Sequence, residues 1–168
     1  MNREQQFNDL YGENKDKIYR ICCFYLDDPD DRQDLFQEVL TNIWRGLDRF
    51  EGRSKMSTWI YRIAVNTSLA YRKKQKKESA KIEDAKVEIN HELNHISGEA
   101  EQEAITNLHR AISGLNKIEK AIISLVLEDF SQKEIAEVMG YSENNIRVRI
   151  HRAKQKLKSV LKPQSHEH

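Results

Sequence analysis

The chain has 168 residues, of which 38% are hydrophobic and 33% charged, and its net charge is +1. A chain of this length and composition forms one domain or two small ones, so we expect compact helical units and not one large core. It has no apolar run of about 18 residues, which argues against a membrane span and against stable membrane insertion.

Residues that break helices are sparse. Two prolines and six glycines interrupt long helical periodicities, and strict apolar–polar alternation is rare, so the predicted fold class is all-α. The N-terminus has no apolar signal core, and the adjacent Cys22 and Cys23 fit no zinc spacing. We therefore expect free thiols and a cytoplasmic location.

The small net charge conceals strong segregation. Lys and Arg counted against Asp and Glu give −4 for residues 1–50, +7 for 51–77, −6 for 78–104, −2 for 105–144 and +7 for 145–162. Two basic blocks separated by an acidic one indicate two nucleic-acid contacts joined by a solvated connector.

The first two predicted helices cover about Glu4–Leu26 and Asp31–Leu47, with an acidic turn between them. The second helix has an apolar stripe and an opposite polar face. That face carries Asp34, Gln37, Glu38, Asn42 and Arg45. The residues alone leave two interpretations open, an ordinary solvated face or a binding surface.

The segment Asp48–Lys55 is polar, contains a glycine and is predicted to be a loop. A third helix follows, with Ser54 or Ser57 as its N-cap. Its basic residues are interleaved with aromatic ones, a pattern that suits single-stranded or locally opened nucleic acid. Trp59 is also consistent with a place in the core.

Residues 78 to about 99 are acidic and only thinly apolar, which predicts a linker. This linker contains His91-Glu92-Leu93-Asn94-His95, which matches the H-E-x-x-H pattern of zinc proteases. The acidic flanks and the absence of any predicted sheet argue against a protease site. Adventitious metal binding by His91 and His95 stays open.

Two further helices are predicted at about Glu101–Ser113 and Lys117–Glu128, with a break at Gly114. Beyond them, Ser131 and Glu134 form a capping box that starts a short helix. Gly140 ends this helix, and Ser142 caps a longer one with apolar residues at helical spacing.

Two capped helices around a glycine turn predict a helix-turn-helix. From residue 145 to 162 its second helix has seven cations and no acid. A helix dipole accounts for cations near the C-terminus, but not for Arg147, Arg149 and Arg152 near the middle. We therefore expect this helix to bind DNA.

These blocks resemble those of one family, the extracytoplasmic-function (ECF) sigma factors, which are small bacterial transcription initiation factors of the sigma-70 family. The resemblance covers about residues 5–77 and 101–161. It is carried by Asp34-Leu35-Phe36-Gln37-Glu38-Val39 with Trp44, by Phe50, Ser54 and Thr58-Trp59-Ile60-Tyr61-Arg62-Ile63-Ala64-Val65-Asn66, and by Ser131-Gln132-Lys133-Glu134-Ile135-Ala136 with Arg147-Val148-Arg149-Ile150-His151-Arg152-Ala153-Lys154.

The resemblance implies a domain plan and a set of partners. Residues 1–77 would bind core RNA polymerase and recognise and melt the downstream promoter element. Residues 78–100 would be the linker, 101–162 the helix-turn-helix domain for the upstream element, and 163–168 a tail. Implied partners are the polymerase β′ and β subunits, promoter DNA and an anti-sigma factor, which could hold the cytoplasmic protein at the membrane. No cofactor, metal or enzymatic activity is implied.

The resemblance also assigns roles to residues. The face for the β′ coiled coil would comprise Asp34, Leu35, Gln37, Glu38, Asn42 and Arg45. The downstream element would meet Phe50, Arg53, Ser54, Lys55, Thr58, Trp59, Arg62, Asn66 and Arg72, with the loop from Phe50 to Ser57 capturing a flipped base. The upstream element would meet Asn144, Asn145, Arg147, Val148, Arg149, His151, Arg152 and Lys154.

The chain departs from the family pattern at two places. Asn144 to Arg149 replaces the usual G-T-V-K-S-R, and Val148 removes a hydroxyl donor, which predicts a different upstream sequence preference. Met56 stands where the family often has Phe. The alternative function is an autonomous dimeric helix-turn-helix regulator, which would leave the first basic block and the Asp34 face unexplained.

Overall fold

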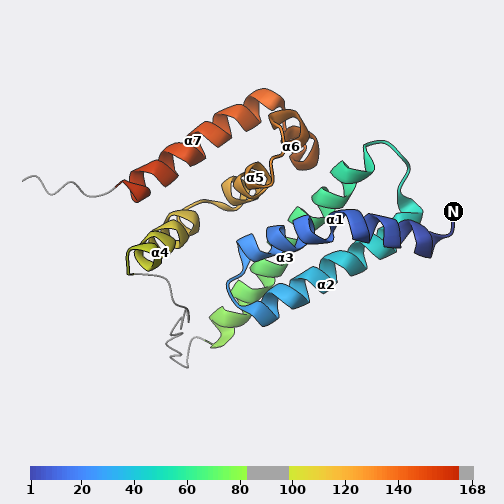
Figure 1. Ribbon diagram of the computed structural model, residues 1–168, viewed down its shortest axis with the longest axis horizontal. Coiled ribbons are helices and arrows are strands. Elements are labelled where there is room, and N and C mark those ends of the chain that lie inside the picture. The colour runs from blue at the N-terminus through green and yellow to red at the C-terminus, as the bar shows by residue number, and fades with distance from the viewer. Residues whose placement is uncertain (83–98, 163–168) are drawn as a thin grey trace, which may run out of the picture.

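The computed structural model describes residues 1–82 and 99–162, and the regular elements in these ranges are all helical (Figure 1). The helices are α1 (Arg3–Tyr25), α2 (Pro29–Gly46), the short 3-10 helix η1 (Leu47–Arg49), α3 (Met56–Ile82), α4 (Glu99–Ser113), α5 (Lys117–Leu127), α6 (Gln132–Met139) and α7 (Glu143–Leu161). The predicted all-α fold class is confirmed. In the described ranges no helix combines the length and apolarity needed to cross a membrane.

Side-chain caps start the first two helices. The Asn2 side chain accepts a hydrogen bond from the Glu4 amide at 3.0 Å, and the Asp28 side chain accepts one from the Asp30 amide at 2.8 Å. Pro29 occupies the first turn of α2, where a missing N–H costs nothing. Each cap satisfies an amide that has no partner within its own helix.

Both ends of α3 differ from the prediction. Ser54 or Ser57 was the expected N-cap, but α3 begins at Met56, and the Ser54 hydroxyl donates to the Lys55 carbonyl. At its other end α3 continues to Ile82, into the predicted linker, because the preceding Lys, Gln, Glu and Ala residues are good helix formers.

Helices α1, α2 and α3 form the N-terminal unit (residues 1–82), a three-helix bundle. Its core consists of side chains that are at most 1% exposed, among them Ile18, Cys22, Leu35, Val39 and Ile60. These residues come from the predicted apolar stripes. Burying one such aliphatic side chain contributes about 1.5–3 kcal/mol, so this core holds the three helices in register.

Helices α4 to α7 form the C-terminal unit (residues 99–162), in which α7 packs along the other three (Figure 1). Its core includes Ile122, Leu125, Ile135 and Ile146, all fully buried. The apolar stripe on α7 stops before the end of the helix, where Val160 and Leu161 are both exposed.

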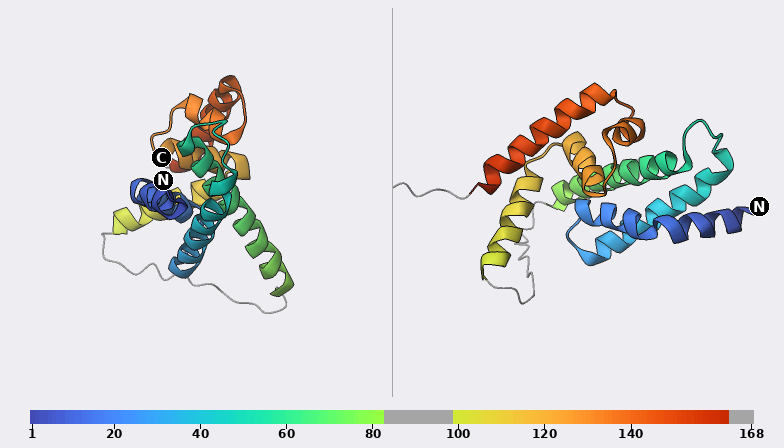
Figure 2. Two further views of the ribbon diagram at one scale, coloured as in Figure 1. Left: turned by 90° about the vertical axis from the view of Figure 1, so that its right-hand side faces the viewer. Right: turned by 45° about the horizontal axis from the view of Figure 1, so that its top comes forward.

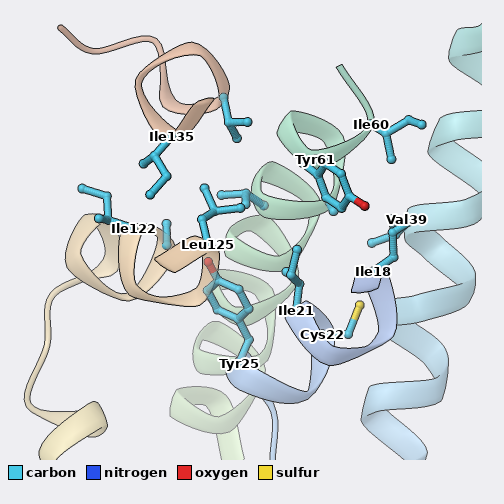
Figure 3. Close-up of a cluster of buried hydrophobic side chains, with 14 of the residues drawn as sticks. Ile18, Ile21, Cys22, Tyr25, Val39, Ile60, Tyr61, Ile122, Leu125 and Ile135 are labelled. Atoms are coloured by element: carbon cyan, nitrogen blue, oxygen red, sulfur yellow. The ribbon is translucent and has the colours of Figure 1, made fainter. Parts of the chain in front are cut away.

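The two units pack against each other, and their buried side chains form one continuous cluster. Helix α1 contacts α5 and α3 contacts α6 (Figure 2). Figure 3 shows Ile21 and Tyr25 of α1 beside Leu125 of α5, with Ile135 of α6 in the same cluster. Sequence patterns predicted two units and left their relative placement open. In the structure they share a core.

Candidate nucleic-acid interface

Helices α6 and α7 form the predicted helix-turn-helix. The Ser131 hydroxyl accepts the Glu134 amide at 3.1 Å, and the Glu134 carboxylate accepts the Ser131 amide at 2.7 Å. These bonds from Ser131 lower the pKa of the Glu134 carboxyl. Gly140 ends α6 at φ +73°, and the Ser142 hydroxyl accepts the Asn145 amide at 3.2 Å to start α7. The turn therefore has the geometry that its residues predicted.

The exposed side of α7 is cationic and polar. Ile146, Ile150 and Ala153 face the core, and Arg149 is half-buried. The predicted site residues that are exposed are Asn144, Asn145, Arg147, Val148, His151, Arg152 and Lys154. No acid follows Glu143 within α7. A rigid helix that presents cations and short polar groups together suits phosphate contact and base reading in a major groove.

Two asparagines hold two arginines on this surface. The Arg147 guanidinium donates to the Asn144 side-chain oxygen at 2.5 Å, and the Arg149 Nε donates to the Asn145 side-chain oxygen at 2.6 Å. The Arg149 guanidinium also lies 5.0 Å from the centre of the Tyr141 ring. Arg149 is thus held by a hydrogen bond and a cation–π contact.

One cation of α7 pairs with a buried carboxylate. The Lys156 ammonium lies 2.7 Å and 2.9 Å from the two carboxylate oxygens of Glu119, which is buried at the start of α5. Glu119 also completes a capping box with Asn116. Desolvation alone would raise the pKa of Glu119, but the bonds from Lys156 and Asn116 lower it overall. Lys156 therefore links α7 to α5 through its ammonium, while 52% of its side chain stays exposed.

In the N-terminal unit, the loop between η1 and α3 packs on an aromatic pair. The Phe50 and Trp59 rings lie 5.3 Å apart between centres, and Trp59 is half-buried against the core. Gly52 takes φ +70°, and Arg53 pairs with Glu51 at 2.6 Å. Trp59 therefore packs on the core, and Phe50 packs on Trp59 at the edge of the loop.

Two predicted DNA-contact residues on α3 form hydrogen bonds with α6. The Thr58 hydroxyl donates to the Glu137 carboxylate at 3.3 Å, and Thr58 is 4% exposed. The Arg62 guanidinium donates to the carbonyls of Val138, at 3.2 Å, and Glu137. Asn66, one turn further along α3, is exposed.

The remaining residues predicted to contact the downstream element differ in their solvent exposure. Arg72 donates to the Tyr25 carbonyl at 3.3 Å and so supports the C-terminal end of α1. Lys55 is exposed and Ser54 is half-buried. The loop is open to solvent, whereas parts of α3 are occupied by protein contacts.

The polar face of α2 is present with two corrections. Its exposed members are Asp34, Gln37, Glu38 and Arg45. Leu35 is fully buried, so it supports this face from below and cannot be a surface contact. Asn42 is half-buried and donates to the Thr67 hydroxyl at 3.1 Å, because it lies where α2 meets α3.

The H-E-x-x-H pattern, including His91 and His95, lies outside the described residues. Within the described ranges, no group of three or more His, Cys, Asp or Glu side chains is arranged to hold a metal ion.

Sequence reasoning missed the residues that join the two units. Arg20 makes three hydrogen bonds of 2.9–3.1 Å to Glu128, whose side chain is only 11% exposed. Tyr61 and Phe130 stack edge to face at 4.8 Å, and the Lys17 ammonium lies 5.1 Å from the centre of the Phe130 ring. Phe130 directly precedes an N-cap, a position where an apolar residue often packs, and this was the available signal.

Comparison with known families assigns both units. The model for Sigma-70 region 2 matches residues 10–78, and the model for Sigma-70, region 4 matches residues 105–157. Together these matches cover most of the chain.

Whole-chain relatives agree with this assignment. The ECF RNA polymerase sigma factor SigW of Bacillus subtilis is 28% identical, over 95% of this chain and 90% of that protein. The ECF RNA polymerase sigma-E factor of Haemophilus influenzae is 29% identical, over 95% of this chain and 89% of that protein.

Solved structures share the fold. CnrH, in complex with the cytosolic domain of CnrY, superimposes with a TM-score of 0.69 at 21% identity, covering 94% of this chain and 88% of that one. The sigma factor RpoE of Bartonella quintana, in complex with the anti-sigma factor NepR, gives a TM-score of 0.67 at 22% identity, covering 93% and 98%.

Proposed function

This chain belongs to the sigma-70 family as an ECF sigma factor, and we propose that its two units divide promoter recognition between them. Such a factor binds core RNA polymerase and directs it to specific promoters as a transcription initiation factor. In our proposal residues 1–77 bind polymerase and open the downstream element, residues 78–100 connect, and residues 101–162 bind the upstream element.

The observation that carries the proposal is the acid-free, exposed surface of α7 on a rigid helix-turn-helix. Arg147 and Arg152 project from its exposed side and can donate two hydrogen bonds to a guanine edge. Val148 lies between them, where it can meet a thymine methyl group. The rest of the upstream site consists of Asn144, Asn145 and His151, together with Arg149 and Lys154. In our proposal Arg149 and Lys154 contact phosphates.

For the downstream element, we assign base capture to the loop from Phe50 to Ser57, which includes Arg53 and Lys55. The nearby positions Thr58, Trp59, Arg62, Asn66 and Arg72 would border the opened strand. Aromatic rings beside cations support this assignment, because bases stack on the former while the latter hold phosphates.

We assign polymerase binding to the exposed polar face of α2, formed by Asp34, Gln37, Glu38 and Arg45. Its acidic character suits a basic partner surface, which the family resemblance identifies as the β′ coiled coil. Asn42 and Leu35 would support this face from the inner side of α2. The β subunit would bind the C-terminal unit.

Regulation by an anti-sigma factor is also part of the proposal. CnrH and RpoE, which share this fold, were solved with CnrY and with the anti-sigma factor NepR. We place the protein in the bacterial cytoplasm, with membrane association only through such a partner, and assign it no catalytic role.

Run-off transcription on a panel of genomic promoters, with and without core polymerase from the same organism, tests the proposal. Start sites that need both components are expected. Arg147→Ala should weaken promoter choice, whereas Asp34→Ala should weaken polymerase binding, and Lys158→Ala serves as a matched control at the far end of α7. Tight duplex binding without any association with polymerase would favour the dimeric regulator instead.

A further inference from the structure

The start of α1 contacts the segment that leads into the proposed base-capture loop. Figure 1 shows the first turn of α1 beside the end of α2, where the chain passes through η1 and enters the loop at Phe50. Arg3, in that first turn, is a cation that none of the proposed promoter or polymerase contacts uses.

The Arg3 guanidinium binds this segment in three ways. One nitrogen donates a hydrogen bond to the Trp44 carbonyl, in the last turn of α2. A second nitrogen lies 2.7 Å from an Asp48 carboxylate oxygen, and the guanidinium carbon lies 4.4 Å from the centre of the Trp44 ring. Because a guanidinium is planar and holds its donors in a fixed fork, these contacts fix η1 relative to α1 in direction as well as in distance.

Burial distinguishes Arg3 from an ordinary surface cation. Only 35% of its side chain is exposed, and its Nε is buried without a hydrogen-bond partner among the described residues. Phe7, one turn further along α1, packs edge to face on the Trp44 ring at 5.3 Å. The ion pair with the exposed Asp48 contributes little stability by itself, so the main effect of these contacts is on geometry.

Helix α3 holds the same segment through Trp59. A Cβ added to Gly46, the last residue of α2, would lie 2.8 Å from the Trp59 ring, so this ring lies directly on the backbone that enters η1. After η1, the Phe50 amide donates to the Leu47 carbonyl at 3.2 Å, and the Phe50 ring lies 5.3 Å from that of Trp59. The first residue of the loop is therefore placed by η1, which α1 and α3 both hold.

We infer that Arg3 is a positioning residue for the base-capture loop and that it acts through Asp48 and the Trp44 carbonyl. The inference rests on the proposed function, and it adds a residue of α1 to the parts that open the promoter. Arg3 itself contacts no DNA. The loop must hold a flipped base and the neighbouring phosphates at the same time, so fixing its first residue in advance lowers the cost of capture.

Promoter opening by holoenzyme, formed from the full chain and core polymerase, tests the inference. The probe is a promoter identified by run-off transcription, with 2-aminopurine at each adenine of the downstream element in turn, because its fluorescence rises when the base leaves the stack. The plateau rate at saturating holoenzyme measures opening. The half-saturating concentration measures binding.

Arg3→Gln should lower the plateau rate about tenfold and leave the half-saturating concentration within about twofold of wild type. Arg3→Lys keeps the charge but not the fork, so its rate should lie between those of Arg3→Gln and wild type. Asp48→Asn should cost about threefold, and the double variant Arg3→Gln/Asp48→Asn should be no slower than Arg3→Gln alone, because both changes remove the same contact.

The matched control is Lys15→Gln. Lys15 is an exposed cation of α1 that lies 5.7 Å from the centre of the Tyr11 ring, about 18 Å along the helix from Arg3. This variant also loses one charge and one cation–π contact, but the lost contact is far from η1, so its plateau rate should match wild type. Thermal unfolding checks that each variant is folded, and a loss of folded protein lowers the signal amplitude and not the plateau rate.

A wild-type plateau rate in Arg3→Gln would overturn the inference, and so would an equal fall in Arg3→Gln and Lys15→Gln. A raised half-saturating concentration with an unchanged plateau rate would also overturn it, because Arg3 would then act in binding. Losses that multiply in the double variant would show that Arg3 does not act through Asp48, which contradicts the inference as well.

Lys55→Ala, inside the loop, distinguishes failure of this inference from failure of the proposed function. If Lys55→Ala slows opening and Arg3→Gln does not, only the inference fails. If both variants open the promoter at the wild-type rate, or if wild type opens no promoter, the proposed function fails and the inference fails with it.

Discussion

The Lys156 ammonium is bound by both carboxylate oxygens of Glu119, at 2.7 Å and 2.9 Å, and this pair joins α7 to the first turn of α5. Lys156 belongs to the most basic stretch of the chain, yet its charge is neutralised within the protein. The pair thus fixes the orientation from which the other cations of α7 face solvent.

Removing this ammonium should destabilise the protein. In Lys156→Met the buried Glu119 keeps its bond to the Asn116 amide but loses its counter-charge, which we expect to lower the free energy of unfolding by about 1–2 kcal/mol. Urea unfolding measures the change. The matched control Lys154→Met, on the exposed side of the same helix, should change stability by less than about 0.5 kcal/mol. Equal losses in both variants would contradict a special role for the pair.

The same pair predicts a pH dependence. Because the pKa of Glu119 is lower in the folded protein than in the unfolded chain, its contribution is complete above the unfolded-state pKa, about 4.3. It is lost as the pH falls through the lower folded-state pKa. The difference in stability between wild type and Lys156→Met should therefore be constant from pH 7 to about pH 5 and shrink at lower pH. A difference that grows on acidification would be inconsistent with this assignment.

Gly140 and Gly12 should respond to alanine in opposite directions. A Cβ at either position has nothing within 4 Å, but Gly140 has φ +73° while Gly12 lies inside α1. Gly140→Ala should cost about 1–2 kcal/mol through backbone strain. Gly12→Ala should add about 0.5–1 kcal/mol of stability through helix propensity. Thermal unfolding measures both changes, and we expect a lower melting temperature for Gly140→Ala and a higher one for Gly12→Ala.

Tyr25 and Tyr61 form a second matched pair. The Tyr25 hydroxyl is buried, which raises its pKa, and it makes no well-aligned hydrogen bond among the described residues, although the nearby Ser124 side chain acts to lower that pKa. The Tyr61 hydroxyl, in contrast, donates to Asn14 at 2.7 Å. Tyr25→Phe removes an unsatisfied group and should raise the free energy of unfolding by about 1 kcal/mol, while Tyr61→Phe should lower it by a similar amount. If both variants lose stability equally, the Tyr25 hydroxyl has a partner after all.

Val148 and Arg149 should separate base reading from phosphate binding. Val148→Asn replaces an exposed apolar group with a hydrogen-bonding one, and should change the preferred base at one upstream position without changing the salt dependence of binding. Arg149→Ala should reduce the slope of log affinity against log salt by about 1 with little effect on sequence preference. Competition binding of holoenzyme to promoter libraries at several salt concentrations measures both quantities.

Local sequence signals predicted the local structure well. The capping box at Ser131, the left-handed Gly140 and the cap at Ser142 are short-range chemistry, and each has the predicted geometry. At the start of α3 the prediction was wrong, because the helix begins at Met56 and the Lys55 carbonyl accepts its first backbone hydrogen bond. Ser54 and Ser57 both lie close to this start, and sequence spacing alone does not fix where the helix begins.

Long-range pairing could not be predicted in the same way. Nothing local to Arg62 or Glu128 shows that one will bind a helix end 75 residues away and the other a guanidinium 108 residues away. Periodicity correctly placed Leu35 in the apolar stripe and Asp34 on the opposite, exposed face, whereas the assignment of Leu35 to the polymerase face came from the family resemblance. These long-range contacts depend on how whole helices pack against one another, and neither hydrophobic periodicity nor helix propensity contains that information.

The core shared by the two units has a consequence for how the chain unfolds. Side chains of α1 and α5 lie in one buried cluster, so the N-terminal and C-terminal units support each other and should unfold in a single cooperative transition. A methyl group removed from Ile21 or Leu125, far from any predicted DNA contact, would therefore lower the stability of both units at once.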